Sequence, residues 1–203
     1  SREKIDLTFS FVEYHYPIII NAFCNEDLKT LRTETGEINV LKERTKKIKK
    51  MGTIGIRRLS SNDALEKGLY FYQANDFISE LIYCLGRINT PCQEHIDNNF
   101  NPLNDIQKEE LRGIMNTVVN IIKESNRIVQ QDVYEERKEL YSNNKNYLSE
   151  LTRIKRGQLK RIKEQQASTK VSMIYLSIIQ ESENIVSYTN NIVKVSRKLQ
   201  RDH

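Results

Sequence analysis

Acidic side chains at helical spacing are the residues of this sequence best suited to chemistry. Asp76 and Glu80 lie four residues apart, and Glu183 stands in the similar segment "QESENI". Carboxylates at i and i+4 lie one above the other on a helix face and repel each other unless a cation lies between them. Oxygen ligands of this kind suit hard or borderline cations. Asp76, Glu80 and Glu183 are therefore candidate metal ligands, and the alternative is that they form the solvated face of a helix.

The two acidic segments belong to a repeat within the chain. "QANDFI" begins at Gln73 and "QESENI" at Gln180, so the offset is 107 residues. The same offset aligns Leu41 with Leu148, Glu43 with Glu150, Thr45 with Thr152, and the basic run 46–50 with 153–157. Several matches at one offset predict a tandem duplication of one structural unit.

The repeated unit is predicted to be a group of three helices. Only 7 Gly and 3 Pro occur among 203 residues, which is typical of long helices with short connections. Near the C-terminus, Ile178, Ile185 and Ile192 recur at steps of seven, as on the buried stripe of a bundle helix. The predicted fold class is all-α, a tandem pair of three-helix bundles with helices at 3–24, 27–59, 63–98, 105–131, 133–165 and 168–201.

Residues that start or interrupt helices set these boundaries. The expected N-caps are Ser60–Asp63, Asp105 and Asp132. We expect Pro17 to kink the first helix, and a break of the second helix at Gly52 or Gly55 is the alternative to one long helix. The domain prediction is a first repeat at 1–98, a linker at 99–104 and a second repeat at 105–203, packed side by side because each is too thin to bury a core alone.

Motifs of known catalytic chemistry are missing from the sequence. It contains no Gly-rich phosphate loop, nucleophile elbow or His-Glu-x-x-His pair, so we predict no catalytic or cofactor-binding residues and no enzyme activity. His15 and His95 stand far apart without a Cys or carboxylate at ligand spacing, and are interpreted as ordinary surface or core residues. The three Cys residues also lack metal-ligand spacing and are interpreted as reduced thiols.

Two basic segments, 42–58 and 153–163, lie at matched places in the two repeats. One interpretation is a solvated face. The other is a surface that meets anionic lipid headgroups or an acidic face of a protein partner. Nucleic acid is not expected as a partner, because the net charge of +5 is modest and no recognition motif accompanies these segments.

The acidic segments resemble the PhoU family of bacterial phosphate-signalling proteins. "ESENIVSYTNNI" (181–192) follows the order of a family pattern of approximately "DLERIGDHAxNI", and "DFISE" (76–80) has its acid-x-x-x-acid spacing. The resemblance implies two tandem three-helix repeats and acids that bind iron or zinc clusters. The sequence departs from the family at Val186, Ser187 and Tyr188, and Ser187 replaces the second acid. A weakened metal site is therefore expected, with Asp76 and Glu80 in the better-preserved repeat.

The resemblance also implies a role in phosphate transport. Such domains occur as free regulators and as domains fused behind sodium/phosphate symporters, and the segments around both acidic motifs resemble the fused kind. A first residue that is not Met and a helix already under way at Glu3 agree with a piece of a longer chain. The expected partner is the membrane portion of a phosphate transporter, at the cytoplasmic side of the inner membrane. Self-association, a stand-alone regulator of phosphate uptake and signalling, and a carboxylate-lined metal-binding protein stay open as alternatives.

Overall fold

The computed structural model describes residues 2–200, and this part of the chain contains six α-helices and no strand. The helices are α1 (Arg2–Cys24), α2 (Leu28–Ile56), α3 (Asn62–Asp97), α4 (Asp105–Gln131), α5 (Arg137–Lys163) and α6 (Thr169–Gln200), with a short 3-10 turn η1 (Tyr134–Glu136) before α5. The prediction of six long helices is confirmed. α2 runs without interruption through Gly52 and Gly55, so the alternative of a broken second helix was wrong.

Local hydrogen bonds decide where the helices begin and end, and two of the expected N-caps were wrong. Ser61 caps α3 by accepting from the backbone N–H of Ala64 at 3.1 Å, within the expected segment. α4 is capped by Asn104 and not by Asp105, because the Asn104 and Gln107 side chains each bond the other's backbone N–H in a capping box. Asp132 ends α4 in a left-handed conformation, at a φ of 57°, and does not cap α5.

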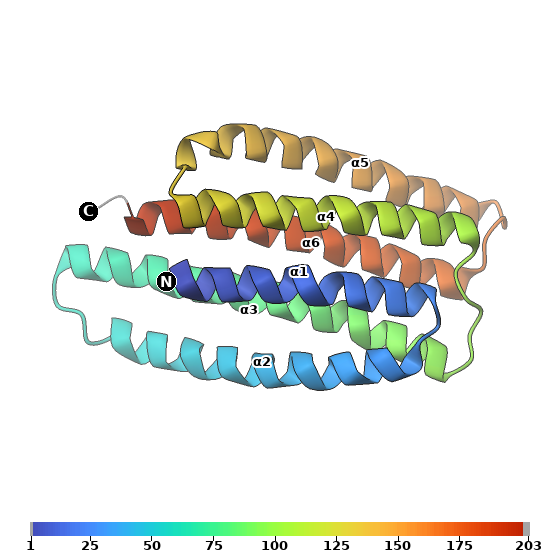
Figure 1. Ribbon diagram of the computed structural model, residues 1–203, viewed down its shortest axis with the longest axis horizontal. Coiled ribbons are helices and arrows are strands. Elements are labelled where there is room, and N and C mark those ends of the chain that lie inside the picture. The colour runs from blue at the N-terminus through green and yellow to red at the C-terminus, as the bar shows by residue number, and fades with distance from the viewer. Residues whose placement is uncertain (1, 201–203) are drawn as a thin grey trace.

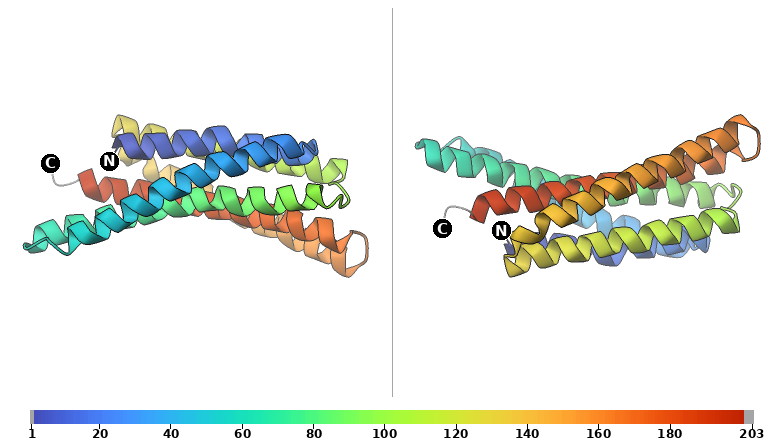
Figure 2. Two further views of the ribbon diagram at one scale, coloured as in Figure 1. Left: turned by 90° about the horizontal axis from the view of Figure 1, so that it is seen from below. Right: turned by 90° about the horizontal axis from the view of Figure 1, so that it is seen from above.

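Successive helices run in opposite directions, and the three helices of the first group precede the three helices of the second group along the chain (Figure 1). α3 and α6 pack closely along the centre and run in opposite directions. α1 packs against α4, and in addition α1 packs against α3 and α4 against α6 (Figures 1 and 2). α2 lies mainly along α3, and α5 mainly along α6, at the two sides of the bundle. The acidic segments therefore lie on the two central helices.

Burial explains why α2 and α5 occupy the sides. α1 buries eleven of its 23 residues, whereas α2 buries four of 29 and α5 four of 27. A helix that buries a narrow stripe can contact one or two neighbours but cannot lie in the middle of a bundle. One continuous hydrophobic core takes side chains from all six helices, including Tyr16, Leu31, Leu85, Val118, Leu151 and Ile185. No helix in residues 2–200 combines the length and the apolar character needed to cross a membrane.

Candidate functional site

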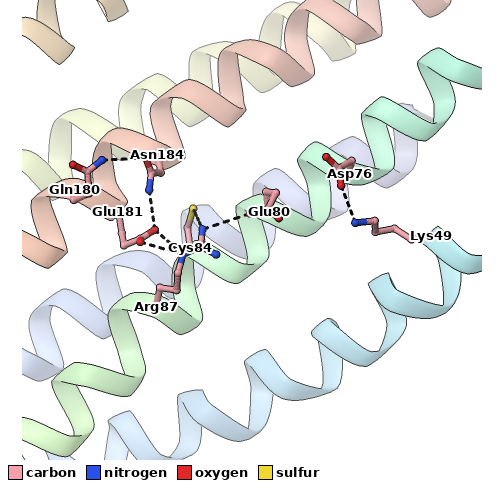
Figure 3. Close-up of polar contacts among 8 residues, drawn as sticks. All are labelled: Lys49, Asp76, Glu80, Cys84, Arg87, Gln180, Glu181 and Asn184. Atoms are coloured by element: carbon pink, nitrogen blue, oxygen red, sulfur yellow. Dashed lines mark hydrogen bonds and ion pairs between the residues drawn. The ribbon is translucent and has the colours of Figure 1, made fainter.

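The predicted metal ligands lie on the two central helices, with Asp76 and Glu80 on α3 and Glu183 on α6. Their positions follow from the helical period, since residues four apart share one face. Figure 3 shows that Asp76 and Glu80 project from successive turns of α3, and that each has a basic side chain beside it. Whether these acids can bind a metal therefore depends on their basic partners.

Asp76 is paired with a lysine from the neighbouring helix. The Lys49 ammonium on α2 donates to Asp76 Oδ1 at 2.7 Å (Figure 3). This hydrogen bond raises the pKa of Lys49, because it favours the charged ammonium. The Lys49 side chain is 28% exposed and that of Asp76 is 41% exposed, so the pair lies at the edge of the α2–α3 contact. An ammonium therefore occupies the position at which a metal would approach Asp76 from α2.

Glu183 has the same kind of partner in the second repeat. Lys155 on α5 donates to Glu183 Oε2 at 2.8 Å and to Gln180 Oε1 at 2.9 Å. Asp76 and Glu183 are 107 residues apart, and Lys49 and Lys155 are 106 apart. In both repeats, then, a lysine of the middle helix neutralises the equivalent acid of the third helix. The sequence matched these basic and acidic runs by offset but did not indicate that they pair.

Glu80 belongs to a different cluster, which joins the two repeats. Arg87 lies 3.6 Å from Glu80 on its own helix, and its Nε donates to both carboxylate oxygens of Glu181 on α6 at 3.1 Å (Figure 3). Asn184 also donates to Glu181, at 3.2 Å. The Glu181 side chain is only 12% exposed, so its charge is largely removed from water and depends on Arg87 for compensation. The sequence does not indicate this bridge, because its residues lie 94 positions apart.

The acids as arranged do not fit a shared metal. Among residues 2–200, no group of three or more His, Cys, Asp or Glu side chains lies close enough together to hold a metal ion. Cys84, which accepts a hydrogen bond from Arg87 at 3.3 Å, is not poised as a ligand, because burial raises the pKa of its thiol to about 12. Metal binding at Asp76, Glu80 and Glu183 stays a prediction, and a metal would have to displace the lysines and Arg87.

His15 and His95 are both buried and both have polar partners. His15 Nδ1 lies 2.6 Å from Glu34 Oε2, joining α1 to α2, and both residues are buried. The ring of His95 contacts the rings of Phe23 and Phe100, and its Nε2 lies 2.6 Å from the backbone oxygen of Asn101. Both are core residues, which is one of the two placements expected. The carboxylate near His15 comes from another helix, so spacing along the chain could not reveal it.

Two groups of three helices that share one core define a PhoU-like all-α fold, as predicted. The chain is similar to PhoU from Pseudomonas aeruginosa, whose crystal structure matches it with a TM-score of 0.72. The match covers 100% of this chain and 96% of that chain at 13% sequence identity, so the likeness shows the fold. No family model and no curated protein matches the sequence.

Proposed function

We propose that the chain is a PhoU-like regulatory domain of a sodium-dependent phosphate transporter, and that it acts by binding the membrane portion of that transporter at the cytoplasmic side. The fold match to PhoU supports the family, because it extends over the whole of this chain and nearly all of the other. The order of residues in 181–192 supports the same family independently of the fold. Regulation here means a change in transport caused by contact, with no reaction performed.

The observation that carries this proposal is the internal pairing of the acidic residues. Asp76, Glu80 and Glu183 each face a Lys or Arg of the same chain. Carboxylates that are already neutralised have little to gain from a metal, because a cation must first be displaced from each. The acids of the two segments thus form ion pairs within the bundle. This favours action by protein contact over metal chemistry.

Co-purification and transport assays test the proposal together. We expect the tagged chain to retain the membrane portion of the transporter in detergent, and we expect deletion of the domain to change sodium-driven phosphate flux. A sodium symporter for another substrate, carrying the same tag, is the control for non-specific retention. Absence of both retention and a flux change would refute the proposal. Retention of an importer and a sensor kinase in place of the symporter would support the stand-alone regulator.

Elemental analysis addresses the metal-binding alternative. We expect less than one equivalent of iron or zinc per chain, and no difference between the unmodified chain and the variant Asp76→Ala/Glu80→Ala. The variant Glu37→Ala/Glu43→Ala removes two exposed acids of α2 and serves as the matched control. One equivalent or more that is lost in the first variant and kept in the control would make metal binding the primary function.

A further inference from the structure

The free end of the α2–α3 hairpin, residues 46–72, concentrates positive charge. It contains seven Lys or Arg residues and two acids, Asp63 and Glu66, for a net charge of +5. Within residues 2–200 no carboxylate forms an ion pair with Lys47, Lys50 or the adjacent Arg57 and Arg58. All four of these cations are exposed and available to an external anionic partner.

The same hairpin end also exposes apolar side chains. It carries eight of the fifteen large hydrophobic side chains that are exposed in residues 2–200: Ile48, Met51, Ile54, Leu59, Leu65, Leu69, Phe71 and Tyr72. Met51 is 71% exposed, more than any other of them. Leu65, Leu69 and Tyr72 follow the i, i+4, i+7 spacing and share one face of α3. Scattered exposed apolar residues are normal, but a concentration at one end of a molecule marks a binding surface.

The hairpin end is accessible because it projects from the bundle. Figures 1 and 2 show α2 and α3 extending past the N-terminal end of α1 and the C-terminal end of α6. Gly68 of α3 lies close to the end of α2 and the turn that follows it, since an added Cβ would lie 3.3 Å from Ile56 Cγ1 and 2.5 Å from Leu59 Cδ1. This contact holds the hairpin together beyond the rest of the bundle, so it can meet a flat surface first.

The opposite end of the bundle provides an internal comparison. The equivalent α5–α6 hairpin end, residues 153–179, has seven Lys or Arg residues and one acid, for a net charge of +6. It exposes only two large apolar side chains, Leu159 and Met173. Charge is therefore common to both hairpin ends, whereas the combination of charge with many exposed apolar side chains belongs to the α2–α3 end alone.

We propose that the α2–α3 hairpin end binds the surface of an anionic lipid bilayer. Basic side chains near a bilayer are attracted to anionic headgroups, and apolar side chains between them enter the boundary between headgroups and acyl chains. Long Lys and Arg side chains keep their charge among the headgroups while the apolar residues go deeper. A second copy of the chain fits this surface less well, because a two-fold contact would place the two sets of cations against each other.

Vesicle sedimentation with the full 203-residue chain tests this inference. We expect binding to vesicles of phosphatidylcholine and phosphatidylglycerol, weak binding to phosphatidylcholine alone, and weaker binding at high salt. Arg57→Glu/Arg58→Glu should lower the partition coefficient about thirtyfold or more, since each basic residue near the surface contributes about 1 kcal/mol. The matched control, Arg156→Glu/Lys163→Glu, makes the same change in net charge at the other hairpin end and should have a much smaller effect.

A second pair of variants tests the apolar contribution. Met51→Ser/Phe71→Ser should weaken binding, whereas Leu159→Ser/Met173→Ser should leave it nearly unchanged. Circular dichroism establishes that all four variants are folded. The inference is overturned if the unmodified chain binds no anionic vesicles, binds neutral vesicles equally well, or loses as much binding in the controls. It is also overturned if the Arg57 and Arg58 variant changes only self-association or only retention of the transporter, and these results leave the proposed function standing.

Discussion

The bridge between the two repeats makes Arg87→Met the most informative single substitution for the architecture. Met keeps most of the side-chain volume and removes the guanidinium, so both oxygens of the Glu181 carboxylate on α6 lose the hydrogen bond that they share from Arg87 Nε. Glu181 is only 12% exposed and would be left as a largely buried charge. The substitution should therefore destabilise the contact between α3 and α6, along which the two repeats meet.

The loss in free energy of unfolding caused by Arg87→Met lies between the values typical of buried and of exposed ion pairs. Removing one partner of a fully buried ion pair costs about 3–5 kcal/mol, and an exposed pair contributes about 0–1 kcal/mol. Arg87 is 42% exposed, and Asn184 still donates to Glu181 after the substitution. The loss of stability should therefore be smaller than for a fully buried ion pair. We expect a loss of about 2 kcal/mol in the free energy of unfolding, which corresponds to a fall in Tm of about 4–8 °C for a chain of this length.

Urea unfolding followed by circular dichroism measures this loss. The double variant Arg87→Met/Glu181→Met should recover most of the stability, because no buried charge is left without a partner. Lys46→Met is the control, since it breaks an exposed i,i+3 pair with Glu43 and should cost less than about 0.5 kcal/mol. A loss for Arg87→Met no larger than in this control, or a double variant less stable than either single variant, would refute the reasoning.

Four further predictions concern buried polar groups and a helix cap. Glu34→Leu should lower the free energy of unfolding by about 2 kcal/mol, because it leaves the buried His15 without its partner, and a loss near zero in urea unfolding would contradict this. Asn104→Ala should cost about 1 kcal/mol through the lost capping box of α4, and Asp105→Ala should cost less. Burial raises the pKa of the Cys84 thiol to about 12, so a thiol reagent at pH 8 should modify it far more slowly in the folded chain than in urea. The same shift stabilises the fold fully below pH 9, and this contribution should disappear as the pH rises from 9 towards 12, which urea titrations across that range would detect.

Helix positions could be predicted from the sequence because they depend on local signals. The apolar period and the scarcity of Gly and Pro act within one segment, and all six expected segments correspond to helices. Caps were less predictable, because neighbouring residues compete for the same position. Asn104 and Asp105 are both good N-caps, and Gln107 decides between them by completing the capping box, a signal that the sequence contains. Asp132 adopts a left-handed conformation that ends a helix, which its residue type alone does not distinguish from capping the next helix.

The candidate site could be predicted only in part, because its partners come from other helices. The helical period was sufficient to place Asp76 and Glu80 on one face of α3. The ion pairs with Lys49 and Arg87 depend on how helices pack, and the residues that pair across helices are up to 94 positions apart. The repeat offset did contain part of the answer, since it aligned the basic run of α2 with that of α5 as well as the two acidic segments. A shared offset shows that both runs were duplicated together, but contact between them within a repeat depends on how the helices pack.

The basic runs and the acidic segments are linked by one ion pair in each repeat. One lysine of each run, Lys49 or Lys155, reaches the acid of the adjacent central helix, and several neighbouring cations on the same helix stay exposed. A tethered ammonium neutralises a carboxylate much as a bound cation would, so the acids can be retained beside the α3–α6 contact without a metal. The one-residue difference between the lysine and acid offsets changes the direction of a side chain on a helix by about 100°, and the long lysine side chain can accommodate it. The acids therefore depend on the charge of the run more than on the exact position of any one lysine in it, and the remaining charges are free to serve the outer surface of the hairpin.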